Sequence, residues 1–392
     1  MPSLGLSRKQ IIILAVLALL DCVVIAGMGL VVIPSLSSTP PPTPQTIAET
    51  DTGVQVTVTS IATPPPPPPT WTPRPTATPP GWKPLYTFDP HKCPFEVPEG
   101  ADVQCGAVIL PEDRESSELG QVHLEVSVYA GEETAEAPPF IYLSGGPGGA
   151  AVEDLSQAYE WFIKPLLAHR DVIAFDQRGI GLSEPNLECF EYVQAAASDL
   201  EKGFSTVERA EAYPEAMRRC HNRLVARGVH PAAYTSAANA ADVRDLVEVL
   251  GYEQAILYGA SYGSRLALTV MRDHPEVVHS AILDGVEPIE APMYNGYAAG
   301  IDRLLHRLFD GCAADMACRR AYPDLEAEYE ALVEQLDADP VEVWTKRVGG
   351  KMYRVRVDGD RLTGTIFYSA YSTEMITYLP RMIRDTAQGD YE

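Results

Sequence analysis

The sequence has few basic residues for its length. It carries 30 Lys and Arg against 54 Asp and Glu, which gives a formal net charge of −24. Nucleic-acid binding needs clustered Lys and Arg to neutralise phosphates, so this balance argues against a nucleic-acid partner. It also argues against adsorption to an anionic membrane surface. Cationic substrates are compatible with the acidic charge, but solubility alone is the simpler interpretation.

Motifs for metals and nucleotide cofactors are missing as well. No cysteine pair has C-x-x-C spacing and no histidine stands at ligand spacing, so we expect no zinc site. None of the glycine-containing segments has the pattern G-x-G-x-x-G or that of a P-loop. A cofactor-dependent enzyme is therefore disfavoured, and we expect no cofactor.

Cysteine is scarce, and its placement is typical of an exported protein. Cys22 lies in an apolar N-terminal run, and six other cysteines follow it. An even number beyond an export signal favours three disulfides. Pairing of sequence neighbours is the simplest connectivity, and it joins Cys93 to Cys105, Cys189 to Cys220, and Cys312 to Cys318.

One long hydrophobic run stands near the N-terminus. A short basic segment, residues 1–10, precedes an apolar run at residues 11–33 that is long enough to span a bilayer. Asp21 costs roughly 3 kcal/mol at a helix centre, but the Leu, Ile and Val of the run outweigh it. We therefore expect a single-pass membrane anchor with the rest of the chain outside the cell. Lipidation at Cys22 is a weaker alternative because Asp21 precedes it, and cleavage after the run stays open.

Proline and threonine dominate the next segment, residues 34–82, which includes the run Pro64–Pro69. Proline fixes φ and lacks an N–H group, so we expect an extended spacer that holds a domain away from the membrane. Recognition of the proline run by a partner and sugars on the threonines are alternatives.

Beyond residue 83 short apolar strands alternate with helices. We expect strands at Gly106–Leu110, Gln121–Ala130, Phe140–Leu143, Asp171–Phe175, Gln254–Tyr258 and Val277–Leu283, and helices at Val152–His169, Ala238–Leu250 and Tyr262–Arg272. This alternation predicts an α/β core over residues 83–286, with a mainly parallel sheet covered by helices on both faces. Residues 287–392 look mostly helical apart from a hairpin around Val341–Val357, and we expect them to form a lid over the sheet.

Three glycine-containing turns follow strands, at the edge where an open α/β sheet places its active site. Residues 144–149, Ser-Gly-Gly-Pro-Gly-Gly, have backbone N–H groups that can approach a ligand, although a plain tight turn has the same sequence. Residues 176–179, Asp-Gln-Arg-Gly, favour a structural interpretation in which Asp176 and Arg178 pair and brace neighbouring loops.

The third turn, residues 259–263, is Gly-Ala-Ser-Tyr-Gly, between an expected strand and an expected helix. G-x-S-x-G arises by chance in glycine-rich chains, but this context is the one that a nucleophile elbow requires. The small flanking residues permit a sharp turn, which exposes Ser261 as a nucleophile. The N–H of Tyr262 at the helix N-terminus can then point at a developing oxyanion.

In order and spacing, these turns resemble the proline iminopeptidase and tripeptidyl aminopeptidase family of serine exopeptidases, which have the α/β-hydrolase fold. The secreted branch is also similar in its two leading cysteines and in the stretch between Cys312 and Cys318. The resemblance covers the chain from about residue 85 to its end. It implies a hydrolase that removes residues from the free N-terminus of short peptides.

By this resemblance Ser261 is the nucleophile, and the N–H groups of Gly146 and Tyr262 form the oxyanion hole. Ser144 departs from the pattern, since iminopeptidases usually carry His before the two glycines. Proline selectivity is therefore not implied.

A serine nucleophile needs a base, and the base needs an acid to orient it. In this fold both follow the serine in sequence. Three histidines follow Ser261, namely His274, His279 and His306. We expect His274 at the far end of a helix, His279 at the wrong edge of the sheet and His306 in the lid. Each is therefore interpreted as a surface or packing residue. Asp284 is a minority candidate for the acid. We expect the acid and base beyond Glu392, and little activity from this chain alone.

Two other functions stay open. The first is an esterase or lipase-like hydrolase, and the second is a non-catalytic, surface-displayed module that keeps the fold. A requirement for a free α-amino group would separate a peptidase from an esterase. Glu287 and Glu290 near the sheet edge could hold that ammonium group, although a solvated acidic face is the simpler interpretation.

Overall fold

The computed structural model describes residues 86–391, except for 117–119, 133–136, 292–295 and 347–351. The expected anchor at residues 11–33, with its Cys22, and the expected linker at residues 34–82 lie outside this range. Within it, no helix is both long and apolar enough to cross a membrane.

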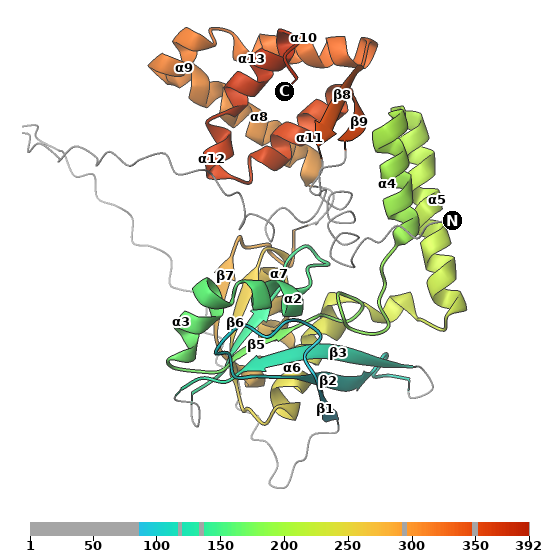
Figure 1. Ribbon diagram of the computed structural model, residues 1–392, viewed down its shortest axis with the longest axis vertical. Helices are drawn as coiled ribbons and strands as arrows, with labels where there is room; N and C mark the ends of the chain where they lie inside the picture. Colours follow the sequence, from blue (N-terminus) through green and yellow to red (C-terminus); the bar gives the residue numbers. More distant parts are fainter. Residues whose placement is uncertain (1–85, 117–119, 133–136, 292–295, 347–351, 392) are drawn as a thin grey trace, which may run out of the picture.

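A seven-stranded sheet forms the centre of the core (Figure 1). Its strands are β1 (Thr87–His91), β2 (Val103–Pro111), β3 (Gln121–Tyr129), β4 (Phe140–Leu143), β5 (Val172–Phe175), β6 (Ala255–Ala260) and β7 (Val278–Asp284). They lie in the order β1-β2-β3-β5-β4-β6-β7. The strands β2, β5, β4, β6 and β7 run in one direction, and β1 and β3 run against them. The expected mostly parallel sheet is therefore confirmed.

Helices cover both faces of the sheet, as the strand–helix alternation predicts. On one face α6 (Ser236–Val249) and α7 (Tyr262–Asp273) bury residues such as Leu246 and Leu266 against the strands. On the other face Leu155 and Ile163 pack on Phe140 and Val172. Thr235 caps α6 by accepting a hydrogen bond from the N–H of Ala238 at 3.1 Å.

The expected continuous helix over Val152–His169 is wrong in detail. The segment divides into α2 (Ala151–Gln157), a π-helical turn η1 (Tyr159–Ile163) and α3 (Lys164–Leu167). Pro165 stands in the first turn of α3. A proline ring has no N–H and clashes with the carbonyl four residues before it, so a widened turn ahead of α3 accommodates it.

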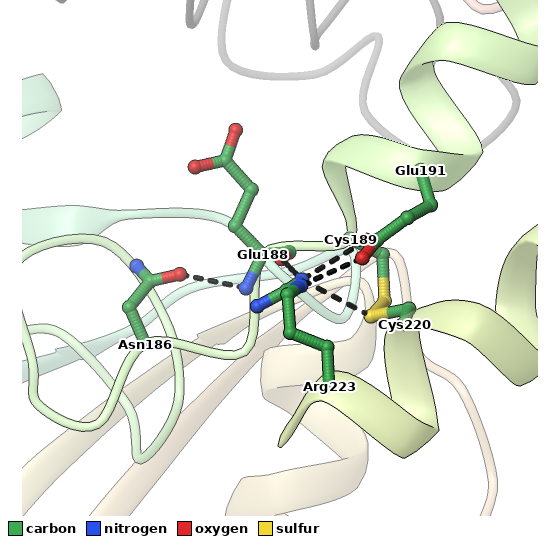
Figure 2. Close-up of a disulfide and its surroundings, with 6 residues drawn as sticks. All are labelled: Asn186, Glu188, Cys189, Glu191, Cys220 and Arg223. Carbon is green, nitrogen blue, oxygen red and sulfur yellow. Dashed lines mark hydrogen bonds and ion pairs between the residues drawn. A yellow bond between two sulfur atoms is a disulfide. The ribbon is translucent and has the colours of Figure 1, made fainter. Parts of the chain in front are cut away.

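A long helical hairpin stands beside the core. It consists of α4 (Phe190–Lys202) and α5 (Thr206–Ala226), and a one-turn 3₁₀ helix η2 (Pro231–Ala233) follows it. Figure 2 shows its root, where a disulfide joins Cys189 at the start of α4 to Cys220 on α5. Arg223 closes the same root through Glu191 at 2.6 and 3.0 Å and through the carbonyl oxygen of Glu188 at 2.7 Å. The two helices are therefore fixed to each other where they leave the core.

A short 3₁₀ turn, η3 (Pro275–Val277), precedes β7. Beyond β7 lies a separate helical unit, defined here as residues 297–391 (Figure 1). Its elements are α8 (Tyr297–Ala314), α9 (Met316–Ala321), α10 (Leu325–Ala338), β8 (Val341–Lys346), β9 (Met352–Val357), α11 (Gly359–Ser369), α12 (Thr373–Ile376) and α13 (Leu379–Ala387). The strands β8 and β9 form the expected antiparallel hairpin. The unit has its own apolar core, which includes Leu332, Leu336, Ile366 and Ile383.

Three disulfides join the pairs that were expected from sequence proximity. They are Cys93–Cys105, Cys189–Cys220 and Cys312–Cys318, with Cα atoms 5.0, 5.3 and 5.0 Å apart. One lies in the first part of the core, one in the hairpin and one in the helical unit. Because disulfides persist in oxidising compartments, they indicate that the folded domain is exposed outside the cytoplasm.

Candidate active site

A sharp turn joins β6 to α7, and Ser261 lies at its apex. Ser261 has φ 52° and ψ −120°, and it is the one non-glycine residue with positive φ within the ranges that the structure describes. Such a conformation is costly for a residue with a Cβ, and it persists only where the surroundings impose it. This strained strand-to-helix turn has the geometry of a nucleophile elbow.

Two glycines allow this turn to close. A Cβ on Gly259 would overlap the backbone of Gly263, and a Cβ on Gly263 would overlap the carbonyl oxygen of Leu143 at the end of β4. The first turn of α7 is therefore packed directly against two strand ends. This contact explains why small residues flank the serine in the sequence.

The loop after β4 lies against the same turn. A Cβ on Gly145 would meet the carbonyl oxygen of Ala260 at 2.8 Å and the Cβ of Ser261 at 3.1 Å. Gly146 has φ +113°, where only glycine is comfortable. Gln177 holds the loop from behind by donating to the carbonyl oxygen of Ser144 at 2.9 Å. The first and third glycine-containing turns of the sequence therefore meet at Ser261.

The two expected oxyanion donors come from these two turns. Gly146 belongs to the loop against Ser261, and Tyr262 is the first residue of α7. Within the described residues neither backbone N–H donates to another group. The first N–H groups of a helix have no partner inside it, so the N–H of Tyr262 is free by position. The Tyr262 side chain, in contrast, is anchored, since its hydroxyl lies 2.9 Å from Ser236 Oγ.

The second turn has a structural role, but the expected pairing of Asp176 with Arg178 is wrong. Asp176 is fully buried and accepts hydrogen bonds from the N–H groups of Ala151, Val152 and Leu182 at 2.7 to 3.0 Å. Burial raises the pKa of Asp176 against these N–H groups, which lower it. Its carboxylate therefore caps α2 and contributes no contact to Ser261.

Arg178 instead pairs with Asp242 on α6. Both side chains are fully buried, with Nε to Oδ2 at 2.6 Å and Nη2 to Oδ1 at 2.7 Å. The remaining nitrogen donates to the carbonyl oxygens of Glu112 and Ala233 at 2.8 and 2.7 Å. A bidentate pair with two further acceptors satisfies the guanidinium, and it joins three separate segments to the turn that follows β5.

The minority candidate for the acid, Asp284, already has a partner. The hydroxyl of Tyr258 donates to Asp284 Oδ2 at 2.7 Å, and burial together with this carboxylate raises the pKa of Tyr258 to about 12. The carbonyl oxygen of Asp284 accepts from the N–H of Ser261 at 2.7 Å. Asp284 therefore borders the elbow, but no described histidine lies against its carboxylate.

The three histidines after Ser261 lie away from it. His274 follows the last residue of α7, about 18 Å along a twelve-residue helix from the elbow. His279 lies at the start of β7, whereas the end of that strand, Asp284, is the part level with Ala260. His306 is exposed in the helical unit and bonds the carbonyl oxygen of Asp302 at 2.8 Å.

Among the described residues, no histidine lies beside Ser261. The side chain of Ser261 makes no hydrogen bond to any residue that the structure describes.

The residues after the serine have partners that the sequence did not suggest. Glu287, considered above as a site for an ammonium group, is paired with Arg265 at 3.2 Å. Ser264 is completely buried and bonds both the elbow and the chain beyond β7. Ser264 and Arg265 stand three and four residues after Ser261 and lie on the same side of α7, which is the one signal in the sequence that could have indicated them.

Comparison with known proteins agrees with this geometry. A family model described as alpha/beta hydrolase fold matches residues 138–370, more than half of the chain. The serine protease Hip1 of Mycobacterium tuberculosis is 24% identical over 279 residues, which are 67% of this chain and 51% of that protein. The proline iminopeptidase of Neisseria gonorrhoeae is 26% identical over 222 residues, or 56% of this chain and 54% of that protein.

The chain spans about half the length of these curated relatives. Among solved structures, an esterase from Exiguobacterium antarcticum is 16% identical, with a TM-score of 0.28, over 52% of this chain and 57% of that one. That score is too low to add to the argument.

Proposed function

The chain belongs to the alpha/beta hydrolase fold family, and on that premise we propose that it is a serine hydrolase that forms an acyl-enzyme on Ser261. The observation that carries the proposal is the strained Ser261 at the β6–α7 turn, with the loop of Gly145 packed against its Cβ. In the proposed reaction Ser261 Oγ attacks the substrate carbonyl. The N–H groups of Gly146 and Tyr262 stabilise the oxyanion that develops. A general base takes the hydroxyl proton and gives it to the amine that leaves as the C–N bond breaks, and water then hydrolyses the acyl-enzyme.

The proposed substrates are short peptides with a free N-terminus, so that the protein acts as an aminopeptidase. Support comes from the serine protease and proline iminopeptidase among its relatives and from the resemblance of its three turns to exopeptidases. Residues 297–391 are then a lid above the strand ends. The same elbow also suits an esterase, which is the alternative, and loss of activity on N-acetylated peptides would separate the two.

We also propose that the acid and the base come from a segment outside the described residues. The strand β7 is the last in the sheet order, so one of its edges has no neighbouring strand among the described residues and could pair with a further strand. Next to that edge Ile282 and Val286 are about half exposed, although both are apolar. A strand added there would be the second neighbour of β6, the strand that ends just before Ser261.

A membrane anchor at residues 11–33 remains our proposal for attachment to the cell surface. The disulfides support an extracellular domain, and the Pro/Thr-rich linker at residues 34–82 would hold it away from the bilayer. Release of the protein from membranes by detergent, but not by high salt, is the expected result of fractionation.

The central test is labelling by a fluorophosphonate probe of protein expressed from the complete gene. Labelling is expected at Ser261 and is expected to disappear in Ser261→Ala, together with a loss of peptide hydrolysis of about 10³-fold or more. Ser280→Ala is the matched control, because Ser280 is exposed on the neighbouring strand. Unchanged labelling in Ser261→Ala would exclude the proposed nucleophile.

The 392-residue chain alone tests where the base lies. We expect it to label slowly, because no histidine is in reach of Ser261 Oγ within the described ranges. Fast labelling that is lost in His274→Gln, His279→Gln or His306→Gln would contradict this proposal and identify the base within the chain.

A further inference from the structure

The first residues after β7 lie beside the nucleophile turn. We call residues 285–291 the exit segment. It begins where Asp284 accepts a hydrogen bond from the N–H of Ser261 at 2.7 Å. Gly285, with φ +61°, then turns the chain beside the elbow, where an added Cβ would lie 3.8 Å from Ser261 N. The first residues of the exit segment are thus in contact with the nucleophile turn itself.

Ser264 joins the elbow and the exit segment through one hydroxyl group. Its Oγ donates to the carbonyl oxygen of Ser261 at 2.6 Å and accepts from the N–H of Glu287 at 2.8 Å. The residue is completely buried, so both bonds are shielded from water. Breaking either hydrogen bond would leave a buried polar group without a partner, which costs free energy, so the closed arrangement is favoured.

Arg265, the next residue on α7, holds the remainder of the exit segment. Its Nη1 donates to the carbonyl oxygen of Ala291 at 2.9 Å and to Glu287 Oε1 at 3.2 Å, and its Nη2 donates to the carbonyl oxygen of Ile289 at 2.7 Å. A longer bond reaches the carbonyl oxygen of Pro288 at 3.3 Å. One guanidinium therefore binds acceptors on four residues of a segment that has a single internal backbone bond, from the N–H of Ala291 to the carbonyl oxygen of Pro288.

We infer that Ser264 and Arg265 are positioning residues that hold the exit segment, which leads from β7 toward the helical unit, in register with the nucleophile elbow. The inference rests on the proposed function, in which the helical unit is a lid over Ser261. Without these bonds the exit segment is a short loop with one internal hydrogen bond, and it can swing relative to α7. With them, the exit segment is fixed to the nucleophile turn through the two hydrogen bonds of Ser264 and to α7 through the guanidinium of Arg265.

Loss of these hydrogen bonds is expected to affect the turnover of peptide substrates but not the reaction of Ser261 with small probes. A small electrophile needs Ser261 and its oxyanion donors only. A peptide must also be oriented by the lid, and misplacing bound substrate by about 1 Å can cost 10²-fold in rate. Weakening Arg265 is therefore expected to reduce peptide turnover far more than it reduces labelling of the serine.

The variant that tests this is Arg265→Met in protein expressed from the complete gene. Its matched control is Arg272→Met, on the same helix, where the arginine is about half exposed, hydrogen-bonds its neighbour Asp273 and interacts with Glu290 of the exit segment through charge alone. Amide hydrogen exchange of residues 287–291 is expected to become about tenfold faster or more in Arg265→Met, with little change in the control. Arg265→Lys keeps the charge toward Glu287 but lacks the planar fork of donors that reaches Ala291 and Ile289 together, so an intermediate increase is expected.

Activity supplies a second measurement. In Arg265→Met we expect kcat/KM for tripeptide substrates to fall about ten- to hundredfold, while the fluorophosphonate labelling rate stays within about twofold. Equal losses of labelling and peptide turnover would mean that the residue only stabilises the fold, which would overturn the inference. So would unchanged exchange at residues 287–291.

The two proposals fail in different ways. If the wild-type protein neither labels nor hydrolyses peptides, the serine hydrolase proposal fails, and the exchange measurement still decides whether Arg265 holds the exit segment. If the wild type is active but Arg265→Met matches it in both exchange and kcat/KM, the positioning role fails on its own.

Discussion

The elbow and the helical unit are held in place by different kinds of interaction. At the elbow the backbone itself is the contact, because Gly259, Gly263 and Gly145 let chain segments approach within distances that any Cβ would prevent. The helical unit is held to the hairpin by side chains instead. There Asp199 on α4 receives Arg361 of α11 at 2.9 Å, and Arg209 on α5 reaches Asp358 at 2.7 Å.

Asp199 is the centre of this second contact. It is buried, and it also accepts from the N–H of Phe204, from Arg209 Nε and from the hydroxyl of Tyr213 at 2.9 to 3.1 Å. Residues separated by more than 150 positions therefore meet through one carboxylate. Figure 1 shows the result, with the hairpin standing beside the sheet and reaching the helical unit near β9.

This difference separates what local sequence encodes from what it does not. A backbone contact that requires glycine leaves a short, contiguous pattern such as G-x-S-x-G. A contact between side chains of distant helices leaves no pattern, since Asp and Arg are common on any exposed helix face. We expect the two regions to respond differently to substitution as well.

The largest effect is expected from Arg178→Met in the core. This change removes a buried guanidinium and leaves Asp242 with Arg114, at 2.6 Å, as its remaining cationic partner, so a loss of up to about 3–5 kcal/mol is expected. The carbonyl oxygens of Glu112 and Ala233 also lose a donor. Chemical denaturation of the variant should show a correspondingly lower free energy of unfolding.

The helical unit offers the matched control for this experiment. Arg354→Met removes an exposed arginine of β9 that lies 3.3 Å from Glu342, and little change in stability is expected because solvent screens this pair. If Arg178→Met does not fold, Arg178→Lys provides the measurement with a smaller loss. A variant of Arg178 as stable as the Arg354 variant would remove the contrast between the two regions.

Much of the core was predictable, for reasons that particular residues make clear. The strand at Phe140–Leu143 has the predicted bounds, since a short apolar run ending in glycines has few other conformations. The β6–α7 turn and the three disulfides were also predicted. The strand β1 was not, because its five residues include Pro90 and do not alternate in polarity. Pro90 fits there because β1 is the edge of the sheet.

The backbone turns of the candidate site were predictable from the sequence, but the partners of its charged side chains were not. The turn at Ser261 follows from its own neighbours, and the loop before Gly149 follows from its glycines. The partners of Arg178 and Arg265 cannot be predicted in this way. Each arginine pairs with a distant segment, and many other carboxylates and carbonyl groups in the sequence look equally suitable as partners. Electrostatic pairing at long sequence separation depends on the finished fold.

A smaller effect is expected from Asp199→Asn at the contact between hairpin and helical unit. The amide keeps the size of the side chain but loses the charge that Arg361 and Arg209 face, and hydrogen bonds to charged groups contribute about 1.5–3 kcal/mol. The expected result is faster amide exchange in α11 and in the tip of the hairpin, with β6 and α7 unaffected. Limited proteolysis should cut the variant between the two regions first.

Asp360→Asn is the control for that variant. Asp360 contacts the same Arg209 at 3.3 Å, but its side chain is 68% exposed. It should behave like the wild type. Equal exchange in the Asp199 and Asp360 variants would mean that the buried carboxylate does not hold the hairpin to the helical unit.

The smallest expected effect is a difference in how the stability of the core and that of the contact between hairpin and helical unit depend on pH. His274 lies at the end of α7, with its side chain 16% exposed. Burial lowers its pKa and Arg244 lowers it further, against Glu276, Asp273 and Asp245, which raise it. Asp358, at the hairpin contact, differs. Burial raises its pKa, but the N–H of Arg361 and the guanidinium of Arg209 lower it more.

The signs of these shifts predict two separate pH windows. The unfolded chain takes up the proton of His274 near pH 6.5, before the folded core does, so the core loses stability as the pH falls below about 6.5. For Asp358 the folded pKa is the lower one, so the hairpin contact keeps its stability until the pH falls below about 4. His274→Asn should flatten only the first window, by no more than the slope for one proton, about 1.4 kcal/mol per pH unit. Exchange in α7 and α11, followed from pH 7 to 5, would contradict this if α11 weakened first.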